Sequence, residues 1–226
     1  MKLFENGKFA VERAAIEDGI KFENAKVVID EPNAAVIDMG RWLKCVFADA
    51  RDYSCYKEKY GISGDVCLIG APEGLAEDPC YTYAYLNPMP PVPQPISGME
   101  IKRLAPSLAE VVLSAYHNPG GGYTVERIAE IMRTKGVFGA IVGGKLAGFI
   151  GRHRDGNMGM LEVFEQFRRR GIAAELEKFL ITYVMTFGRV PICDVYADNP
   201  ASMALQSKLG LTKGVGCTYW ISADNE

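Results

Sequence analysis

The stretch that most constrains the fold is the proline-rich segment "NPMPPVPQPISGM" at residues 87–99. Five of its residues are proline, which fixes the backbone φ angle and lacks the amide donor that helices and central strands need. An extended linker is the conformation that remains. The linker divides the chain of 226 residues into an N-terminal α/β module at 1–86, the linker itself at 87–98 and a C-terminal domain at 99–226.

Composition and charge narrow the class of protein. Hydrophobic residues make up 48% of the chain and the net charge is -3, so a globular protein without electrostatic preference for nucleic acid is expected. Neither a signal-peptide core nor an apolar run long enough for a membrane span is found. The six cysteines have no C-x-x-C spacing and the histidines are only His117 and His153, which predicts reduced thiols, a cytoplasmic location and no metal site.

The N-terminal module reads as a series of strands and carries no motif that indicates a chemistry. Short apolar runs bounded by polar residues predict strands at 25–29, 34–38, 42–47, 66–70 and 81–86.

The C-terminal domain has a clearer alternation of elements. The pattern predicts a strand at 99–104, helices at 105–116 and 124–136, and two strands within 137–153 joined at Gly143-Gly144. A strand at 157–164, a helix from Ile172, a strand at 190–197, a helix at 198–211 and a strand at 218–222 follow. This order predicts a mixed α/β fold.

One phosphate-binding motif is rejected. Residues 139–145, "GAIVGGK", match the P-loop pattern, but Leu146 stands where a P-loop needs Ser or Thr for magnesium. The segment also lies within the predicted hairpin and not between a strand and a helix.

A second candidate for anion binding is the turn "RRRGIA", which begins at Arg168. It joins a predicted strand to a predicted helix, and Gly171 and Ala173 are small enough to let an anion approach the backbone amides at the helix N-terminus. Three interpretations remain open from the residues alone: an anion cradle, a solvated basic face and a nucleic-acid contact.

The turn resembles the R/Q-x-x-G-x-G/A signature of the GNAT acetyltransferases, with Arg168, Gly171 and Ala173 at the signature positions. "DNPASMALQSKLGL" resembles the second signature of that family, and the order of elements agrees. The resemblance covers 99–226 and implies a mostly antiparallel sheet flanked by helices. Some relatives carry a degenerate GNAT-like half in front, which makes that a candidate for 1–86.

The resemblance implies an acyl-CoA cosubstrate, acetyl-CoA in the first place, without a metal. It assigns the CoA pyrophosphate to the turn and the start of the helix, and the pantetheine arm to the preceding strand. Asn199 matches an asparagine that contacts the cosubstrate, although a plain helix N-cap explains it equally well. The implied cofactor-binding residues are Leu161, Glu162, Val163, Arg168, Arg169, Arg170, Gly171, Ile172, Ala173, Ala174 and Asn199.

Two carboxylates are candidates for the general base that deprotonates an acceptor amine. Glu162 and Asp194 each interrupt an apolar strand, where an unpaired charge is costly. Glu162 is favoured because the resemblance puts it next to the thioester. An exposed edge or a local ion pair is the alternative for both residues.

Gln206 is the main departure from the family. It stands where the family has a tyrosine that acts as general acid, and an amide cannot supply a proton at a useful pKa. Tyr196 and Tyr219 are possible substitutes. The sequence thus predicts an N-acyltransferase acting on a small-molecule or amino-acid-like amine, with a catalytically weak CoA-binding sensor as the alternative. A homodimer is allowed, and neither nucleic acid nor a membrane is expected as a partner.

Overall fold

The computed structural model describes residues 1–5, 7–117 and 122–223. The chain divides into two compact units, one formed by Met1–Leu86 with Ile192–Glu226 and the other by Asn87–Pro191. The C-terminal residues from Ile192 therefore pack with the N-terminal residues. The sequence domains 1–86, 87–98 and 99–226 follow a different partition and stay a prediction.

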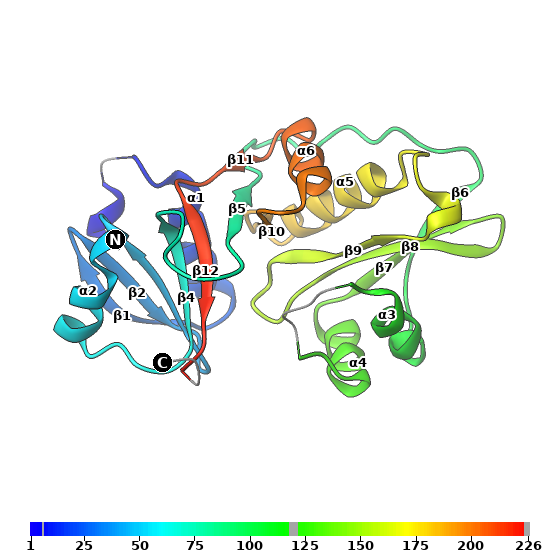
Figure 1. The fold of residues 1–226 in the computed structure, drawn as a ribbon. Helices are drawn as coiled ribbons and strands as arrows, with labels where there is room; N and C mark the ends of the chain where they lie inside the picture. The colour runs from blue at the N-terminus through cyan, green and yellow to red at the C-terminus, as the bar shows by residue number, and fades with distance from the viewer. Residues whose placement is uncertain (6, 118–121, 224–226) are drawn as a thin grey trace. The chain divides into compact units, whose positions relative to one another are not determined.

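The first unit contains a sheet with the strand order β1-β2-β3-β4-β12-β5-β10, and β11 pairs with β5 (Figure 1). β3 and β4 run parallel, whereas the other pairs are antiparallel. The strands are β1 (Lys26–Glu31), β2 (Ala34–Asp38), β3 (Leu43–Phe47), β4 (Val66–Ala71), β5 (Cys80–Ala84), β10 (Ile192–Tyr196), β11 (Thr212–Lys213) and β12 (Cys217–Ile221). The helices are α1 (Ala10–Phe22), α2 (Tyr53–Tyr60) and α6 (Pro200–Lys208).

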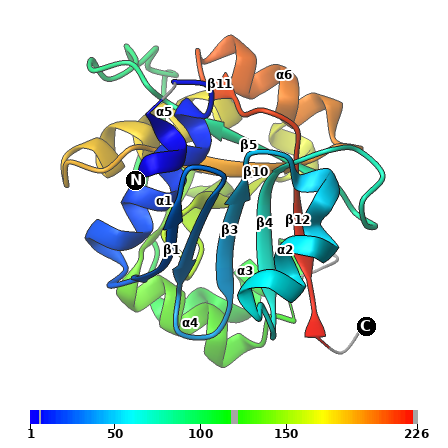
Figure 2. The ribbon, with the colours of Figure 1, turned by 90° about the vertical axis from the view of Figure 1, so that its left-hand side faces the viewer.

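The helices α1 and α2 cover opposite faces of this sheet (Figure 2). Val36 of β2 belongs to the apolar cluster that contains Tyr53 of α2. Its neighbour Ile37 lies against Gly19 of α1, so closely that a Cβ on the glycine would come within 2.7 Å of Ile37 Cδ1. Because successive side chains of a strand point to opposite faces, β2 is buried on both sides.

The strand β5, from the N-terminal part of the chain, pairs with strands from the C-terminal part. It pairs along its whole length with β10 on one side, and it pairs with β11 and β12 on the other side. A strand from the N-terminal part of the chain thus lies between strands that come from its C-terminal part. Sequence patterns do not reveal this strand order, because the residue pattern of a strand does not depend on which strand pairs with it.

The second unit has an antiparallel sheet with the order β9-β8-β7-β6. Val137 of β7 packs in the apolar cluster with α3 and α4, whereas the ring of Phe138 contacts that of Phe179 in α5 at 5.0 Å. The helices α3 and α4 therefore cover one face and α5 the other, as Figure 1 shows. The elements are β6 (Met99–Arg103), α3 (Ala109–Ala115), α4 (Val125–Thr134), β7 (Val137–Val142), β8 (Lys145–Arg152), β9 (Met158–Val163) and α5 (Ile172–Met185).

The mixed α/β class predicted from sequence is confirmed, and so is the hairpin at Gly143 and Gly144, whose φ angles of 56° and 75° fit a tight turn. The helices α1 and α2 were not predicted. α1 buries charged residues such as Glu12 and Asp18, and these interrupt its apolar periodicity. No helix in the described part of the chain has both the length and the apolar character that a bilayer crossing requires.

Candidate functional site

The strand β9 contains a bulge next to the predicted site residues. The register with β8 shifts between Phe149 and Gly151, so that Met160 and Leu161 together lie opposite one residue of β8. Met160 has a φ of 53°, which is a strained conformation for a residue with a long side chain. Its side chain is buried beneath α3 and α4, and this packing keeps the backbone in place.

The last residues of β9 direct main-chain groups away from the sheet. Phe164 donates its N–H to Ala147 O of the neighbouring chain segment at 2.9 Å, so the alternation along a strand turns the main-chain groups of Leu161 and Val163 the other way. Within this unit β9 is an outermost strand. Leu161, Glu162 and Val163, the residues predicted to line the pantetheine arm, therefore include outward-facing N–H groups.

The side chain of Arg168 binds a backbone carbonyl of the protein, whereas an anion-binding role would leave it free for a ligand. Its Nε donates to Val163 O at 3.0 Å, which ties the turn to the end of β9. Arg170 places its guanidinium over the ring of Phe167 at 5.7 Å. Both arginines hold the turn through their side chains, and the amides of the turn remain for a ligand.

The turn itself has two residues in the left-handed region. Arg169 has a φ of 63° and Gly171 a φ of 81°, and Gly171 immediately precedes α5. Among the described residues, no backbone acceptor binds the N–H groups of residues 169–174. Successive amides that point the same way at the start of a helix form a concave anion site. The chain thus fits a diphosphate here. The residues that supply these amides are Arg169, Arg170, Gly171, Ile172, Ala173 and Ala174.

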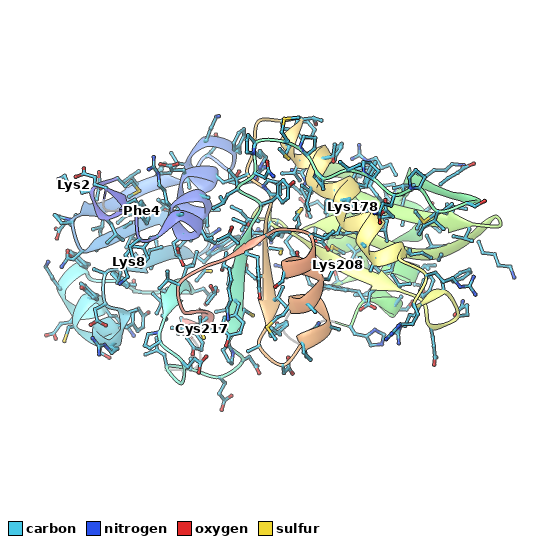
Figure 3. All side chains as sticks on the ribbon, turned by 90° about the horizontal axis from the view of Figure 1, so that it is seen from above. Lys2, Phe4, Lys8, Lys178, Lys208 and Cys217 are labelled. Carbon is cyan, nitrogen blue, oxygen red and sulfur yellow. The ribbon has the colours of Figure 1, made fainter. Side chains whose placement is uncertain are left out.

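The first turn of α5 is fixed by a buried ion pair. Glu175 and Lys178 are 7% and 9% exposed, and Lys178 Nζ lies 2.8 Å from Glu175 Oε1. Figure 3 labels Lys178 on this helix. The other carboxylate oxygen accepts the backbone N–H of Gln94 at 2.7 Å, and Ile96 lies beside Gly171. The proline-rich segment is therefore anchored to the start of α5.

Glu162 projects from β9 toward the end of α3. Its Oε1 accepts the backbone N–H of His117 at 3.1 Å and lies 3.5 Å from His117 Nδ1. The side chain of Glu162 is 18% exposed and that of His117 is 81% exposed. A carboxylate that is mostly buried yet reachable from a loop can accept a proton. The glycine-rich segment "HNPGGGY" at 117–123 falls largely on residues 118–121, which lie outside the described residues.

Three aromatic residues near Glu162 were not predicted as site residues. Tyr123 Oη lies 2.7 Å from His153 Nδ1, and the ring of Tyr116 lies 5.9 Å from that of Tyr123 and 6.4 Å from that of His153. The segment "YHNPGGGY" is marked as a loop by its glycines, which indicate no role for its tyrosines. The contact between Tyr123 and His153 joins residues 30 positions apart, so no local pattern indicates it.

Asp194 is held within the first unit. Its Oδ1 accepts a hydrogen bond from Thr82 Oγ1 at 2.6 Å, directly across from β10 to β5. This partner explains how the apolar strand tolerates a carboxylate. Asn199 caps α6, because its Oδ1 accepts the N–H of Ser202 at 3.0 Å. The N-cap interpretation therefore accounts for Asn199 without a ligand.

Gln206 is buried at 2% exposure, and its Oε1 has no hydrogen-bond partner among the described residues. The two tyrosines considered as substitutes for a general acid differ in their contacts. Tyr219 donates its hydroxyl to Pro72 O at 3.0 Å. Burial is the main reason that the pKa of Tyr196 is raised, which makes it a weaker acid.

The comparisons with known proteins concern the fold and one matched segment of the chain. Residues 135–221 match the FR47-like protein family. A Drosophila protein has a similar structure, with 18% identity and a TM-score of 0.62 over 84% of this chain and 74% of that chain. An acetyltransferase of the GNAT family from Colwellia psychrerythraea has 15% identity and a TM-score of 0.54 over 97% of this chain and 95% of its own.

A GCN5-related N-acetyltransferase from Kribbella flavida is also similar, with 11% identity and a TM-score of 0.52 over 93% of either chain. No curated protein matches the sequence. At these identities the similarity is one of fold. The resemblance stated from the "RRRGIA" turn is confirmed at the level of fold: the chain has the fold of GCN5-related N-acetyltransferases, and its residues 135–221 match the FR47-like protein family.

Proposed function

We propose that the chain is an acyl-CoA-dependent N-acyltransferase, which transfers an acetyl group from acetyl-CoA to the primary amine of a small-molecule or amino-acid-like acceptor. The observation that carries the proposal is the turn before α5. Arg169 and Gly171 are both left-handed there, and the following N–H groups have no backbone acceptor within the described residues. Such a turn offers backbone donors to a diphosphate without relying on exposed side chains.

The cosubstrate would be held mainly by main-chain groups. The amides of residues 169–174 would bind the pyrophosphate, and the outward-facing groups of Leu161 and Val163 would bind the pantetheine arm. Val163 O already accepts Arg168 Nε, so we assign the pantetheine arm to the Val163 N–H and to the main-chain groups of Leu161. When bound, acyl-CoA supplies a thioester carbonyl that an amine can attack.

Glu162 is the group that would take the proton from the acceptor amine. It needs no charged partner to stay in position, because the backbone N–H of His117 holds one of its oxygens. Its other oxygen keeps lone pairs for the amine or for a bridging water. General base catalysis of this kind contributes about 10² to 10⁴ in rate.

A CoA-binding sensor is the second candidate, and Gln206 is the observation that favours it. A buried amide in α6 cannot protonate a leaving thiolate. A thiolate with a pKa of about 8.5 leaves without assistance, so a slower enzyme is also consistent with Gln206.

Two glycines provide a matched test of the diphosphate site. Gly171 and Gly188 both have positive φ, at 81° and 69°, and a Cβ added at either position would meet no atom closer than 3.7 Å. Alanine at either position should cost about 1 kcal/mol of stability. Only Gly171→Ala should also lose the stabilisation by acetyl-CoA, which for wild type reaches about 2.7 kcal/mol in free energy of unfolding at a hundredfold excess over Kd. This stabilisation is detected as a rise in melting temperature.

The outcomes separate the candidates. No stabilisation of the wild type by acetyl-CoA would refute both the transferase and the sensor. Stabilisation together with thiol release in the presence of amines supports the transferase. Stabilisation without thiol release from any amine supports the sensor.

A further inference from the structure

The strand β1 is the outer strand of the sheet in the first unit. It stands at one end of the strand order, and within the described residues its only strand partner is β2 (Figure 2). No backbone group of the described residues outside the β1–β2 ladder binds the main chain of residues 26–31. Val27 and Val28 are 50% and 54% exposed. An open edge with exposed apolar side chains can pair with a further strand.

The edge has a bulge in its middle. The register with β2 shifts between Val27 and Ile29, so that Val28 is the extra residue. Ile29 packs against the apolar cluster on the α2 side, whereas Val27 lies opposite Ile37, which faces α1. A bulge bends and twists an edge strand, so a regular strand fits it poorly. A second copy of β1 has the same bulge and can match its shape.

The sequence of β1, "KVVIDE", is complementary to itself when it is read in the opposite direction. In the antiparallel register centred between Val28 and Ile29, the opposed pairs across two copies are Lys26 with Glu31, Val27 with Asp30, and Val28 with Ile29. The two charged pairs and the side of the sheet agree in this register, because Lys26 and Glu31 both lie on the α2 side. A shift by one residue would set side chains of opposite faces against each other.

Glu31 is prepared to bind a further cation. Its Oε2 accepts a hydrogen bond from Tyr60 Oη at 2.6 Å and lies 3.3 Å from Lys59 Nζ. The hydrogen bonds from Tyr60 and Lys59 hold the pKa of Glu31 below its usual value, so the carboxylate is charged at neutral pH. Both contacts use Oε2, which leaves Oε1 for another donor. Lys26 is exposed at the opposite end of the strand.

We propose that β1 pairs antiparallel with β1 of a second copy of the chain, which gives a two-fold symmetric homodimer with two Lys26–Glu31 pairs. Opposed charges and opposed apolar side chains on neighbouring strands stabilise such a pairing. The two-fold axis closes the interface, so that the pairing ends at two copies. Six residues from each chain bury less than the roughly 800 Å² per partner of a standard interface, so the dimer is weak and depends on concentration. The inference does not depend on the proposed transferase function.

The experiment is sedimentation equilibrium of the full chain up to millimolar concentration. We expect a monomer–dimer equilibrium for the wild type. Lys26→Glu and Glu31→Lys should each weaken the dimer at least about fivefold, because each sets like charges opposite each other twice. An equimolar mixture of the two variants should regain dimerisation, because each altered position of one variant then faces an opposite charge in the other. The mixture therefore tests the register itself.

Lys145→Glu is the matched control, because Lys145 is exposed at the start of β8 in the second unit. It makes the same change of charge outside β1 and should leave the equilibrium as in the wild type. Thermal melting shows whether each variant folds. If loss of the Tyr60 contact unfolds Glu31→Lys, the comparison of Lys26→Glu with Lys145→Glu decides the question.

Three results would overturn the inference. The first is a wild type that stays monomeric at every concentration, which would leave the edge without this partner. The second is a wild-type dimer that Lys26→Glu and Lys145→Glu affect equally, which would place the interface elsewhere. The third is a mixture of two folded variants that stays as monomeric as each variant alone.

Discussion

The hydroxyl of Thr82 in β5 lies 2.6 Å from a carboxylate oxygen of Asp194 in β10 and 2.6 Å from the hydroxyl of Thr218 in β12. Since Thr82 donates its proton to Asp194, Thr218 is the donor in the second hydrogen bond. Asp194 thus belongs to a set of side-chain hydrogen bonds that links three strands. Glu162, in contrast, receives its hydrogen bond from the backbone of a loop residue, His117.

This difference predicts that Glu162 is the base. Glu162→Gln keeps an acceptor for the N–H of His117 but cannot take a proton, so kcat/KM should fall by about 10² to 10⁴. Glu110→Gln, on the exposed side of α3, is the control for loss of a carboxylate. A larger loss in Asp194→Asn than in Glu162→Gln would contradict the assignment.

Glu12 should make stability depend on pH. It is 1% exposed in α1, one oxygen accepts the N–H of Val215, and the other has no partner among the described residues. Burial raises its pKa above 4.5. The folded state therefore binds the proton more tightly than the unfolded state, and stability falls as pH rises from 4.5 through the raised pKa.

Glu12→Gln should remove this fall in the free energy of unfolding, measured by chemical denaturation at several pH values. Glu17→Gln on the same helix is the control, because Glu17 is exposed and pairs with Arg13. Parallel pH curves for the wild type and Glu12→Gln would contradict the prediction.

The buried pair at the start of α5 should be sensitive to the loss of one partner. Glu175→Ala leaves Lys178 buried without its carboxylate and frees the N–H of Gln94, so we expect a loss of about 3 to 5 kcal/mol. The exposed pair Arg13–Glu17 offers a matched comparison, and Glu17→Ala should cost about 0.5 kcal/mol or less. Denaturation midpoints measure both. Similar losses would show that the burial of Glu175 contributes nothing.

Thiol reactivity should separate one cysteine from the rest. Cys55 in α2 is exposed, whereas the other cysteines are buried, and burial raises the pKa of Cys45 to about 12. Since the thiolate is the reactive form, an alkylating reagent should label Cys55 first in the native protein. Mass spectrometry after timed labelling tests this order. All six should react once the chain is unfolded.

Much of the fold followed from local patterns. The hairpin of β7 and β8 was marked by Gly143 and Gly144, and α6 by Asn199 and Pro200 at its start. Helix α1 was not predicted because its buried residues include the charged Glu12 and Asp18, which interrupt the apolar periodicity of the helix. The position of β5 between β10 and β12 also could not be predicted from the sequence, because pairing between strands that are distant in the sequence leaves no periodic pattern of residues.

The site was predictable where a local sequence carries the geometry. The turn at Gly171 has a signature because its backbone needs a residue that tolerates positive φ. Glu162 stood out as a charge in an apolar strand. The contact of Tyr123 with His153 was not predictable, because it depends on the empty space above Gly159, which forms only after β8 and β9 pair.

The position of β5 has a consequence for synthesis of the chain on the ribosome. The first 86 residues leave the ribosome with β4 and β5 made but with their partners β10 and β12 still untranslated. Residues 87–191 have all the strands of their own sheet and can fold in the meantime. The unit that begins first is therefore completed last, and its exposed strand edges must wait for the final segment of the chain.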